Sequence, residues 1–220
     1  MKQRMLEDTS MLNVHSFPLG PLQTNCFLLS NSSEAVAVDP GGEPGSVVSF
    51  LTKNTLKLTH ILNTHFHFDH ILGNKALKEA TGAPILASPK DDFLLQAQVG
   101  GGGGMMGFPK VEPFEYEPLE PGETTFLGER CLVLPTPGHT PGGLSFYFPD
   151  SGQVFSGDLI FHRSVGRTDF PGGSTETLLK SVREQIFTLP DTTVIYNGHG
   201  PETTVHDEKL FNPFFQEGIM

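Results

Sequence analysis

The chain has 220 residues, of which 14 are basic and 25 are acidic, giving a net charge of −11 at pH 7. Such an excess of negative charge disfavours nucleic acid and anionic membranes as partners, and RNA processing in particular fits poorly. With 37% hydrophobic residues, 18 Phe and 25 Gly, the composition indicates a globular protein with many turns, and we expect a single domain over residues 1–220.

The N-terminal residues predict neither a secretory signal nor a membrane anchor. Residues 1–14 include Glu7 and Asp8 and no apolar run of signal-peptide length, and no later stretch is long enough to cross a bilayer. Cys26 and Cys131 each lie in an apolar run, which predicts packing in the core rather than a disulfide framework. A cytoplasmic location is therefore the default expectation.

The first hundred residues alternate between predicted strands and predicted helices. Short apolar runs bounded by turn residues predict strands over residues 12–17, 26–30, 35–39, 58–62 and 85–87. Helical spacing predicts helices over residues 45–53, 71–80 and 90–99. The second of these helices is expected to stop at Gly82 and Pro84.

Residues 100–107 interrupt this alternation with five consecutive glycines followed by Met-Met-Gly. A phosphate-binding loop would continue with Gly-Lys-Ser/Thr, which does not follow here. We therefore interpret this stretch as a flexible surface loop.

The second half of the chain is richer in strands. They are predicted over residues 130–134, 144–148, 154–155 and 193–196, with one helix over residues 175–187 that Ser174 would cap. Both halves place strands first and helices later, which suits two sheets packed face to face with helices outside. Loops at the strand ends would then lie along one edge.

One strand-end loop, residues 64–70, concentrates three imidazoles and a carboxylate within six residues. His65 and His67 are two residues apart and project the same way on extended backbone, while Asp69 and His70 come where a helix begins. Imidazole and carboxylate are the ligands of a divalent metal such as zinc. The loop therefore predicts a metal site.

Three further strand-end loops each add one polar group flanked by glycine. His139 follows one strand, Asp158 another and His199 the last. Glycine beside each of them lets the backbone approach a metal or substrate closely. Together with the first loop, they predict a site built from distant parts of the chain.

In this order the motifs resemble those of the metallo-β-lactamase fold superfamily and, within it, the short bacterial glyoxalase II-like (hydroxyacylglutathione hydrolase-like) hydrolases. The resemblance covers nearly the whole chain and is carried by Asn25-Cys26-Phe27, Asp39-Pro40-Gly41, residues 64–70, Gly138-His139-Thr140, Ser156-Gly157-Asp158, Gly166-Arg167-Thr168-Asp169 and Gly198-His199-Gly200-Pro201. It implies an α/β fold, a four-layer αβ/βα sandwich with a two-metal centre on its edge.

The resemblance also implies a ligand set for each ion: His65, His67 and His139 for one, Asp69, His70 and His199 for the other, and Asp158 bridging both. Zinc is the first choice, with iron or manganese as alternatives, because mixed His and carboxylate ligands select weakly among these metals. Asp39 would either support a ligand or form a turn.

The implied activity is hydrolysis of a small-molecule 2-hydroxyacyl thioester, S-lactoylglutathione or a relative, by a metal-bridging hydroxide. Two divalent ions favour an anionic tetrahedral intermediate and lower the pKa of water to about 7, so no Ser or Cys nucleophile is needed. Asp69 is expected to be the catalytic carboxylate that orients the hydroxide. Arg167 matches a basic residue that contacts substrate in the resembling thioesterases, and the alternative is that it pairs with Asp169.

One departure from the family concerns the thiol half of the substrate. Glyoxalase II enzymes that act on glutathione thioesters carry a long C-terminal helical region, whereas 21 residues follow His199 here. The thiol half of the substrate is therefore left open.

Two other classes of function remain as alternatives. A related family, the persulfide dioxygenases, uses a single iron held at positions that match His65, His139 and Asp158, a two-His-one-carboxylate triad. A non-catalytic metal-binding protein is disfavoured because the ligand set is complete. β-Lactam hydrolysis is disfavoured because the Asp158 position matches the glyoxalase-like branch.

The remaining histidines fall outside the ligand loops. His15, His60 and His206 are expected to have no direct role, since an isolated His is usually at the surface or satisfied in the core. His162 and Arg163 follow Asp158 closely and are candidates to line a pocket.

Overall fold

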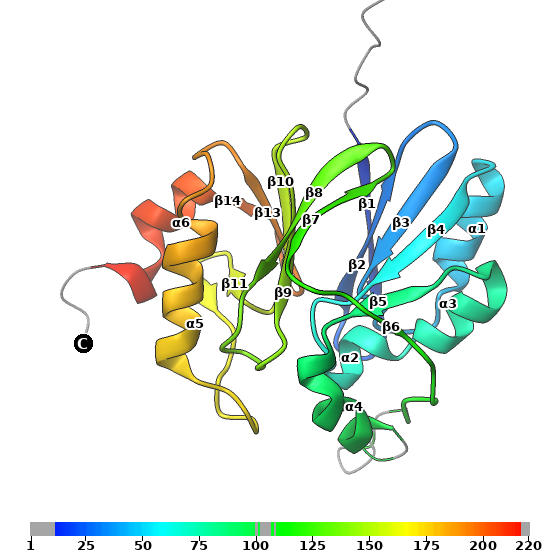
Figure 1. Ribbon diagram of the computed structural model, residues 1–220, viewed down its shortest axis with the longest axis horizontal. Coiled ribbons are helices and arrows are strands. Elements are labelled where there is room, and N and C mark those ends of the chain that lie inside the picture. Colours follow the sequence, from blue (N-terminus) through cyan, green and yellow to red (C-terminus); the bar gives the residue numbers. More distant parts are fainter. Residues whose placement is uncertain (1–11, 100, 102–106, 108, 217–220) are drawn as a thin grey trace, which may run out of the picture.

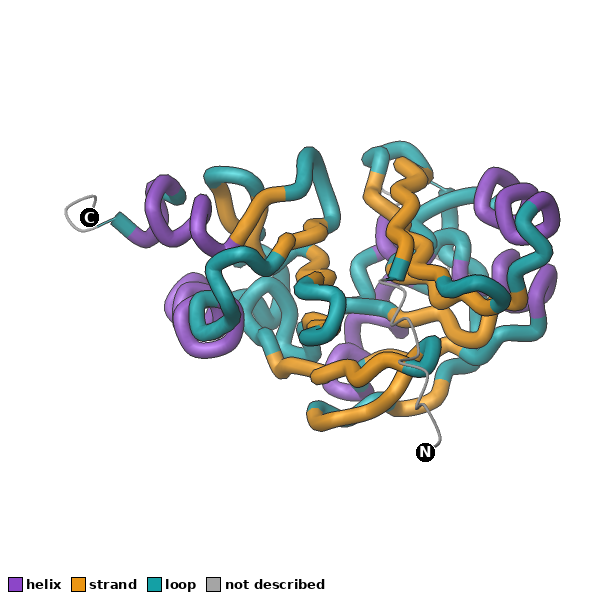
Figure 2. Tube along the Cα trace, turned by 90° about the horizontal axis from the view of Figure 1, so that it is seen from above, coloured by secondary structure: helices purple, strands orange, loops and turns teal. Residues whose placement is uncertain are grey.

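A computed structural model describes residues 12–99, 101, 107 and 109–216 (Figure 1). Two six-stranded sheets face each other, with helices on the outer side of each. Figure 2, seen from above, shows helices at both flanks and strands between them. The predicted four-layer αβ/βα sandwich is confirmed. The glycine-rich stretch of residues 100–107 lies almost entirely outside the described residues.

The first sheet has the order β1-β2-β3-β4-β5-β6. Its strands are β1 (Asn13–Leu19), β2 (Thr24–Ser30), β3 (Glu34–Val38), β4 (Lys57–Leu62), β5 (Ile85–Ala87) and β6 (Glu117–Pro118). Strands β1 to β3 pair antiparallel, whereas β3 to β6 pair parallel. The parallel strands consequently end at the same edge of the sheet.

The second sheet has the order β14-β13-β10-β9-β8-β7. Its strands are β7 (Gly122–Phe126), β8 (Glu129–Pro135), β9 (Leu144–Phe148), β10 (Gln153–Gly157), β13 (Val194–Asn197) and β14 (Thr203–Thr204). Strands β10 and β13 are parallel, so their carboxyl ends also lie together. A separate two-stranded ribbon, β11 (Ile160–Phe161) with β12 (Ser164–Val165), follows β10.

Alternation along the strands divides the apolar side chains between layers. In β2, Phe27 and Leu29 belong to the cluster between the two sheets, whereas Leu28 belongs to the cluster under the helices α1 (Gly45–Lys53) and α3 (Asn74–Thr81). In β10, Phe155 faces the other sheet and Val154 faces the helical layer. Successive strand residues point to opposite faces, so both faces of each sheet are buried.

Helices α5 (Thr175–Ser181) and α6 (Val205–Phe211) lie outside the second sheet (Figure 1). The Ser174 side chain accepts a hydrogen bond from the Thr177 backbone N–H at 3.3 Å, as predicted for a cap. The predicted helix over residues 175–187 is α-helical only to Ser181 and continues as a π-helical turn, Val182–Ile186.

The predicted helix over residues 71–80 is wrong in its extent. The chain forms the short helix α2 (Phe68–Ile71) and then α3, and the two are separated at Gly73. The Gly73 backbone N–H donates to the Pro40 carbonyl at 2.7 Å, and a Cβ on Gly73 would lie 2.1 Å from the Gly42 carbonyl oxygen. Close contact with the turn after β3 therefore breaks the helix.

The third predicted helix, residues 90–99, begins with a 3-10 turn, Pro89–Asp91, and continues as α4 (Asp92–Gln98). Cys26 and Cys131 are both free and buried, in different layers of the core, which confirms that they are packing residues. Burial raises the pKa of the Cys131 thiol to about 12. No helix within the described ranges is long and apolar enough to cross a membrane.

Candidate metal centre

The seven predicted ligand side chains converge on the edge of the sandwich near α2. They come from the loop after β4 and the start of α2, the loop after β8, the end of β10 and the end of β13. Each of these segments follows a strand whose carboxyl end points to this edge. The order of strands in the two sheets therefore brings together residues that are up to 134 positions apart in the chain.

The first group consists of His65, His67 and His139, each of which offers one ligand atom within 4.8 Å of the others. The His139 Nδ1 lies 2.7 Å from the Arg167 carbonyl oxygen and must donate its proton there, because a carbonyl only accepts. The lone pair of His139 Nε2 then faces the site, 2.8 Å from His67 Nδ1. His67 Nδ1 therefore donates a hydrogen bond to His139 Nε2, and a metal held by both nitrogens would replace the proton between them.

The second group consists of Asp69, His70 and His199, again within 4.8 Å of one another. His199 Nε2 lies 3.2 Å from Asp69 Oδ2, and His70 Nε2 lies 3.6 Å from the same oxygen. The Thr24 hydroxyl donates to Asp69 Oδ2 at 3.1 Å and orients the carboxylate.

Asp158 lies between the two groups. Its Oδ1 is 3.3 Å from His70 Nε2, while its Oδ2 is 3.5 Å from His199 Nε2 and 3.7 Å from His139 Nε2. One oxygen thus faces the second group only, and the other faces both. A carboxylate in this position can bind two cations at once.

Asp39 supports the second group, which is one of the two roles considered for it. Its Oδ2 accepts from the Thr64 hydroxyl at 2.6 Å and from His70 Nδ1 at 2.9 Å, and its Oδ1 accepts from the Thr64 backbone N–H at 2.8 Å. The residue adopts a positive φ of 50°. Its hydrogen bond to Nδ1 leaves His70 Nε2 as the ligating nitrogen.

The centre contains buried polar atoms that a cation would satisfy. Among the described residues, His65 Nε2, His70 Nε2 and Asp158 Oδ1 are buried without a hydrogen-bond partner, and the 3.3 Å approach of the last two is not aligned as a hydrogen bond. Buried polar atoms are normally paired. Imidazole nitrogens and carboxylate oxygens turned toward one point suit divalent metals, so the residues present fit such an ion.

The two groups differ in their protonation. Burial, reinforced by His139, lowers the pKa of His67 to about 3, so this imidazole is neutral and ready to bind a cation. Burial alone would also lower the pKa of His199, but its hydrogen bonds to Asp158 and Asp69 outweigh this effect and raise the pKa to about 9. Burial opposes a charge on His70 as well, yet the neighbouring carboxylates hold its pKa well above the ordinary value. The second group therefore holds protons that a metal would displace.

Glycine beside the ligands is required by close packing. A Cβ on Gly198 would lie 2.2 Å from Asp158 Oδ1 and 2.7 Å from His70 Cε1. Gly157 adopts a φ of 51°, and a Cβ there would lie 2.2 Å from the Thr64 hydroxyl. The flanking glycines predicted from the sequence thus let the ligand loops approach one another.

A pocket of about 790 Å³ opens beside the cluster. Cluster members His67, Asp69, His139, Asp158 and His199 form one part of its lining. The rest is Leu22, Phe68, Leu94, Ala97, Gln98, Phe161, Ser164, Val165, Arg167, Phe170 and Pro171. A concave, largely apolar site with a few convergent polar groups is the usual form of a small-molecule site.

Arg167 lines this pocket and pairs with Asp169 at the same time. Its Nε and Nη2 donate to the two Asp169 carboxylate oxygens at 2.7 Å each, and the guanidinium carbon lies 3.9 Å from the centre of the Phe170 ring. The pairing of Arg167 with Asp169, one of the two roles expected from the sequence, is therefore present. Contact between Arg167 and a substrate is a proposal.

A family model described as the metallo-β-lactamase superfamily matches residues 19–199. The chain belongs to the metallo-β-lactamase superfamily. Among its relatives, the probable metallo-hydrolase YqgX of Bacillus subtilis is 37% identical over 199 residues, covering 90% of this chain and 94% of that protein. The hydroxyacylglutathione hydrolase GloC of Haemophilus influenzae is 34% identical over 207 residues, covering 92% and 98%. These relatives and the site identify a metal-dependent hydrolase of the superfamily.

Three solved structures match more than nine-tenths of this chain. The BLEG-1 B3 metallo-β-lactamase has a TM-score of 0.86 at 36% identity, covering 93% of this chain and 100% of that one. TTHA1623 in a di-iron-bound form has a TM-score of 0.83 at 38% identity, covering 91% and 100%. ETHE1 from Myxococcus xanthus has a TM-score of 0.71 at 29% identity, covering 91% and 83%.

The histidines outside the seven predicted ligands lie away from the candidate metal centre. His15 packs at a tilt against Phe50, His60 packs edge-on against Phe126, and His206 lies 3.7 Å from Asp191. The suggestion that His162 and Arg163 line the pocket is wrong. The pocket is lined by Phe161 and Ser164 on either side of them, and Arg163, with a φ of 60°, turns to pair with buried Glu208 at 2.8 Å.

The sequence did not predict the role of Asp91, which holds one of the ligand loops. Asp91 is buried and accepts from the Thr140 hydroxyl at 2.7 Å and from the Gly142 backbone N–H at 2.6 Å, on the loop that carries His139. Nothing in its local sequence distinguishes it from an ordinary helix-start aspartate. Its role follows only from the packing of α4 against that loop.

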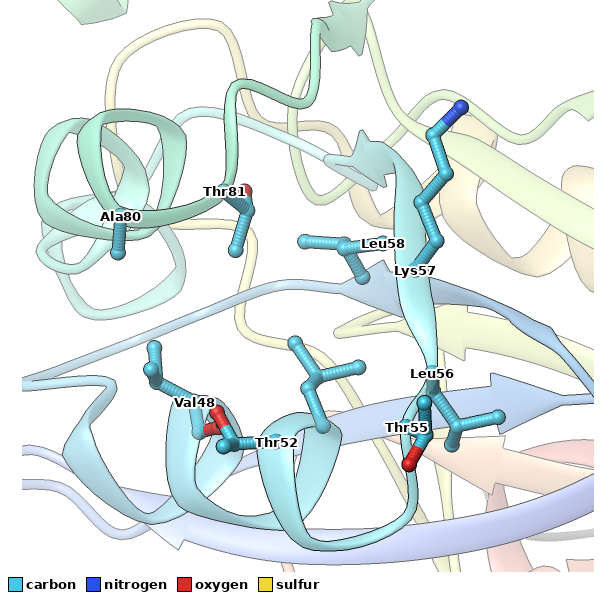
Figure 3. Close-up of a pocket in the computed structure, with 9 residues that line it drawn as sticks. Val48, Thr52, Thr55, Leu56, Lys57, Leu58, Ala80 and Thr81 are labelled. Carbon is cyan, nitrogen blue, oxygen red and sulfur yellow. The ribbon is translucent and has the colours of Figure 1, made fainter.

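A second hollow of about 430 Å³ lies on the far side of the first sheet, between α1, the start of β4 and the end of α3 (Figure 3). Its lining consists of Val48, Leu51, Thr52, Thr55, Leu56, Lys57, Leu58, Ala80 and Thr81. It contains no histidine or carboxylate, so it lacks the groups of a metal or acid-base site.

Proposed function

We propose that this protein hydrolyses 2-hydroxyacyl thioesters, S-lactoylglutathione or a related compound, with two divalent metal ions. The observation that carries the proposal is the convergence of two ligand groups around Asp158, with buried nitrogens turned toward the centre. Similarity to GloC, a hydroxyacylglutathione hydrolase, supports thioesters as the substrate class. The apolar pocket supports a small molecule rather than a polymer as the substrate.

In this proposal, one ion would be held by His65, His67 and His139. The other would be held by Asp69, His70 and His199. Asp158 would bind both ions. When bound, such a pair of ions lowers the pKa of water and stabilises negative charge on the carbonyl oxygen. We propose zinc as the native metal. The di-iron form of TTHA1623 supports including iron in the test.

The protein's own residues orient the reaction. Asp69, fixed by the Thr24 hydroxyl, faces the centre and would align the attacking water as the catalytic carboxylate. Arg167 lies in the pocket wall, where its guanidinium can donate a hydrogen bond to a substrate oxygen. The surrounding apolar side chains exclude other water molecules, which strengthens the electrostatic interactions at the carbonyl.

The test is metal analysis followed by a thioester assay. Purified protein is expected to hold two divalent ions per chain and to hydrolyse S-lactoylglutathione or a close analogue, and His65→Ala and Asp158→Ala are expected to reduce the rate by at least a hundredfold. Because BLEG-1 is described as a metallo-β-lactamase, β-lactams belong in the same panel. Variants as active as the parent would disprove the proposal.

A second candidate is a persulfide dioxygenase with one iron at His65, His139 and Asp158. The resemblance to ETHE1 supports keeping it, at a lower TM-score and identity than the BLEG-1 and TTHA1623 structures. One iron per chain and oxygen uptake with glutathione persulfide would favour this candidate. Two ions per chain and no oxygen uptake would reject it.

A further inference from the structure

The part of the pocket that lies beyond the metal cluster has an apolar wall. Leu94 and Ala97 of α4, Phe68 of α2, Phe161 of β11 and Phe170 line it. The polar side chains in this part, apart from Arg167, are Gln98 and Ser164, and both are neutral. A substrate whose carbonyl reaches the cluster must lay its remaining atoms against this wall.

The charge of Arg167 is already compensated within the wall. Both oxygens of Asp169 accept hydrogen bonds from the guanidinium, which also stacks on Phe170. The hydrogen bonds from Arg167 lower the pKa of Asp169 to about 2, so the pair stays ionised and net neutral at neutral pH. Among the described residues that line the pocket outside the cluster, Arg167 is the one cation. A substrate carboxylate would therefore meet a cation that already pairs with Asp169, in a part of the pocket where both side chains are more than half exposed.

Glutathione is a poor match for such a wall. Any of its two carboxylates and one ammonium group that enters the apolar part of the pocket would lose water, and a buried charge is costly unless it is paired. The overall charge of −11 adds repulsion for an anion approaching the pocket. An alkyl or aryl group, in contrast, gains by leaving water for apolar contact.

We propose that the preferred thiol half of the substrate is a neutral alkyl or aryl thiol rather than glutathione, and that it lies against the apolar pocket residues Leu94, Ala97, Phe161 and Phe170. This inference rests on the proposed thioesterase function and names its substrate class. In the reaction, a water oxygen forms the new bond to the acyl carbon, the acyl C–S bond breaks, and a proton from water ends on the departing thiolate.

The first experiment uses the metal-loaded protein to compare hydrolysis of the S-lactoyl esters of benzyl mercaptan, N-acetylcysteamine and glutathione. The acyl half is constant, so differences in kcat/KM report the thiol half. We expect the benzyl ester to exceed the glutathione ester by at least tenfold, with the neutral polar ester between them. A glutathione ester hydrolysed as fast as the benzyl ester, or faster, would overturn the inference while supporting the thioesterase function.

Binding affinity, measured by calorimetry, tests the preference for the thiol half without hydrolysis. The ligands are thioethers of the same thiols, in which a methylene replaces the carbonyl of the ester. The benzyl thioether is expected to bind at least tenfold more tightly than the glutathione thioether. Tighter benzyl binding without hydrolysis of any ester would reject the thioesterase function but support the neutral pocket. Equal binding of the two thioethers would overturn the inference.

A pair of variants on α4 tests the wall directly. Ala97 is exposed and lines the pocket, whereas Gln96 is exposed on the same helix and does not line it. Lysine is well tolerated at an exposed helix position, so both variants should fold. Ala97→Lys is expected to lower the benzyl-to-glutathione ratio of kcat/KM by at least fivefold, while Gln96→Lys leaves it unchanged. An equal ratio in both variants would contradict the assignment of this wall to the thiol half.

Discussion

Replacing Asp39 with Asn tests whether this buried carboxylate orients a ligand. Three donors converge on it: the Thr64 backbone N–H, the Thr64 hydroxyl and His70 Nδ1. An amide has one accepting oxygen, so its NH₂ group must face at least one of these donors in either orientation. Asn tolerates a positive φ as well as Asp does, so the backbone at φ 50° is not strained by the change.

The expected loss combines one charged hydrogen bond with one buried donor left unpaired, about 2–4 kcal/mol of unfolding free energy. For a chain of this size that corresponds to a fall in Tm of roughly 4–15 °C. If the amide NH₂ faces His70, the imidazole must place its proton on Nε2, the nitrogen that would bind the metal. Metal affinity should therefore fall about 10- to 100-fold, as is usual when a residue that orients a ligand is changed.

The assay is thermal unfolding of the metal-free protein together with metal titration against a competing chelator. Asp191→Asn is the matched control, because Asp191 is exposed and pairs with Lys209 at the surface, and it should change stability by less than about 0.5 kcal/mol. An Asp39→Asn protein with the metal affinity and stability of the parent would refute the role assigned to this residue.

Three further predictions follow from other contacts. Gly198→Ala should abolish binding of at least one metal in chelator competition, because its Cβ would collide with Asp158 Oδ1; retained stoichiometry would contradict this packing. Asp91→Ala should lower the unfolding free energy by about 2–5 kcal/mol in denaturant titration, since two donors on the His139 loop lose a buried acceptor, and an unchanged midpoint would argue against the tether. The raised pKa of His199, about 9, means that its contribution to the stability of the metal-free protein is fully present below about 6.5 and is lost as the pH rises through 9. Metal binding at pH 7.5 should displace this proton, and calorimetry in buffers of different ionisation enthalpy should detect at least one proton released; none would refute the protonated state.

Local sequence patterns were sufficient to predict most of the strands and the ligand loops. The predicted strand over residues 58–62 agrees with β4, and those over residues 85–87 and 144–148 coincide with β5 and β9. These strands are rich in buried apolar residues, so their signal lies in their own residues. The loop of residues 64–70 was recognisable for the same reason, because its ligands are neighbours in the chain.

Only the tertiary structure decided the features that depend on distant partners. The two-residue strands β6, β11, β12 and β14 exist because another strand pairs with them, and their own residues carry too weak a signal to predict them. The break between α2 and α3 at Gly73 is caused by the turn after β3, which helical spacing cannot reveal.

The amino-acid sequence by itself determined which chemical groups would form the site, because each ligand stands in a strand-end motif. What it could not determine is how neighbouring charges are compensated. Arg163 and Arg167 look equally available in the sequence, but one pairs with Glu208 away from the pocket and the other with Asp169 in its wall. Charge compensation depends on which side chains meet in space, so the polarity of the pocket was decided only by the fold.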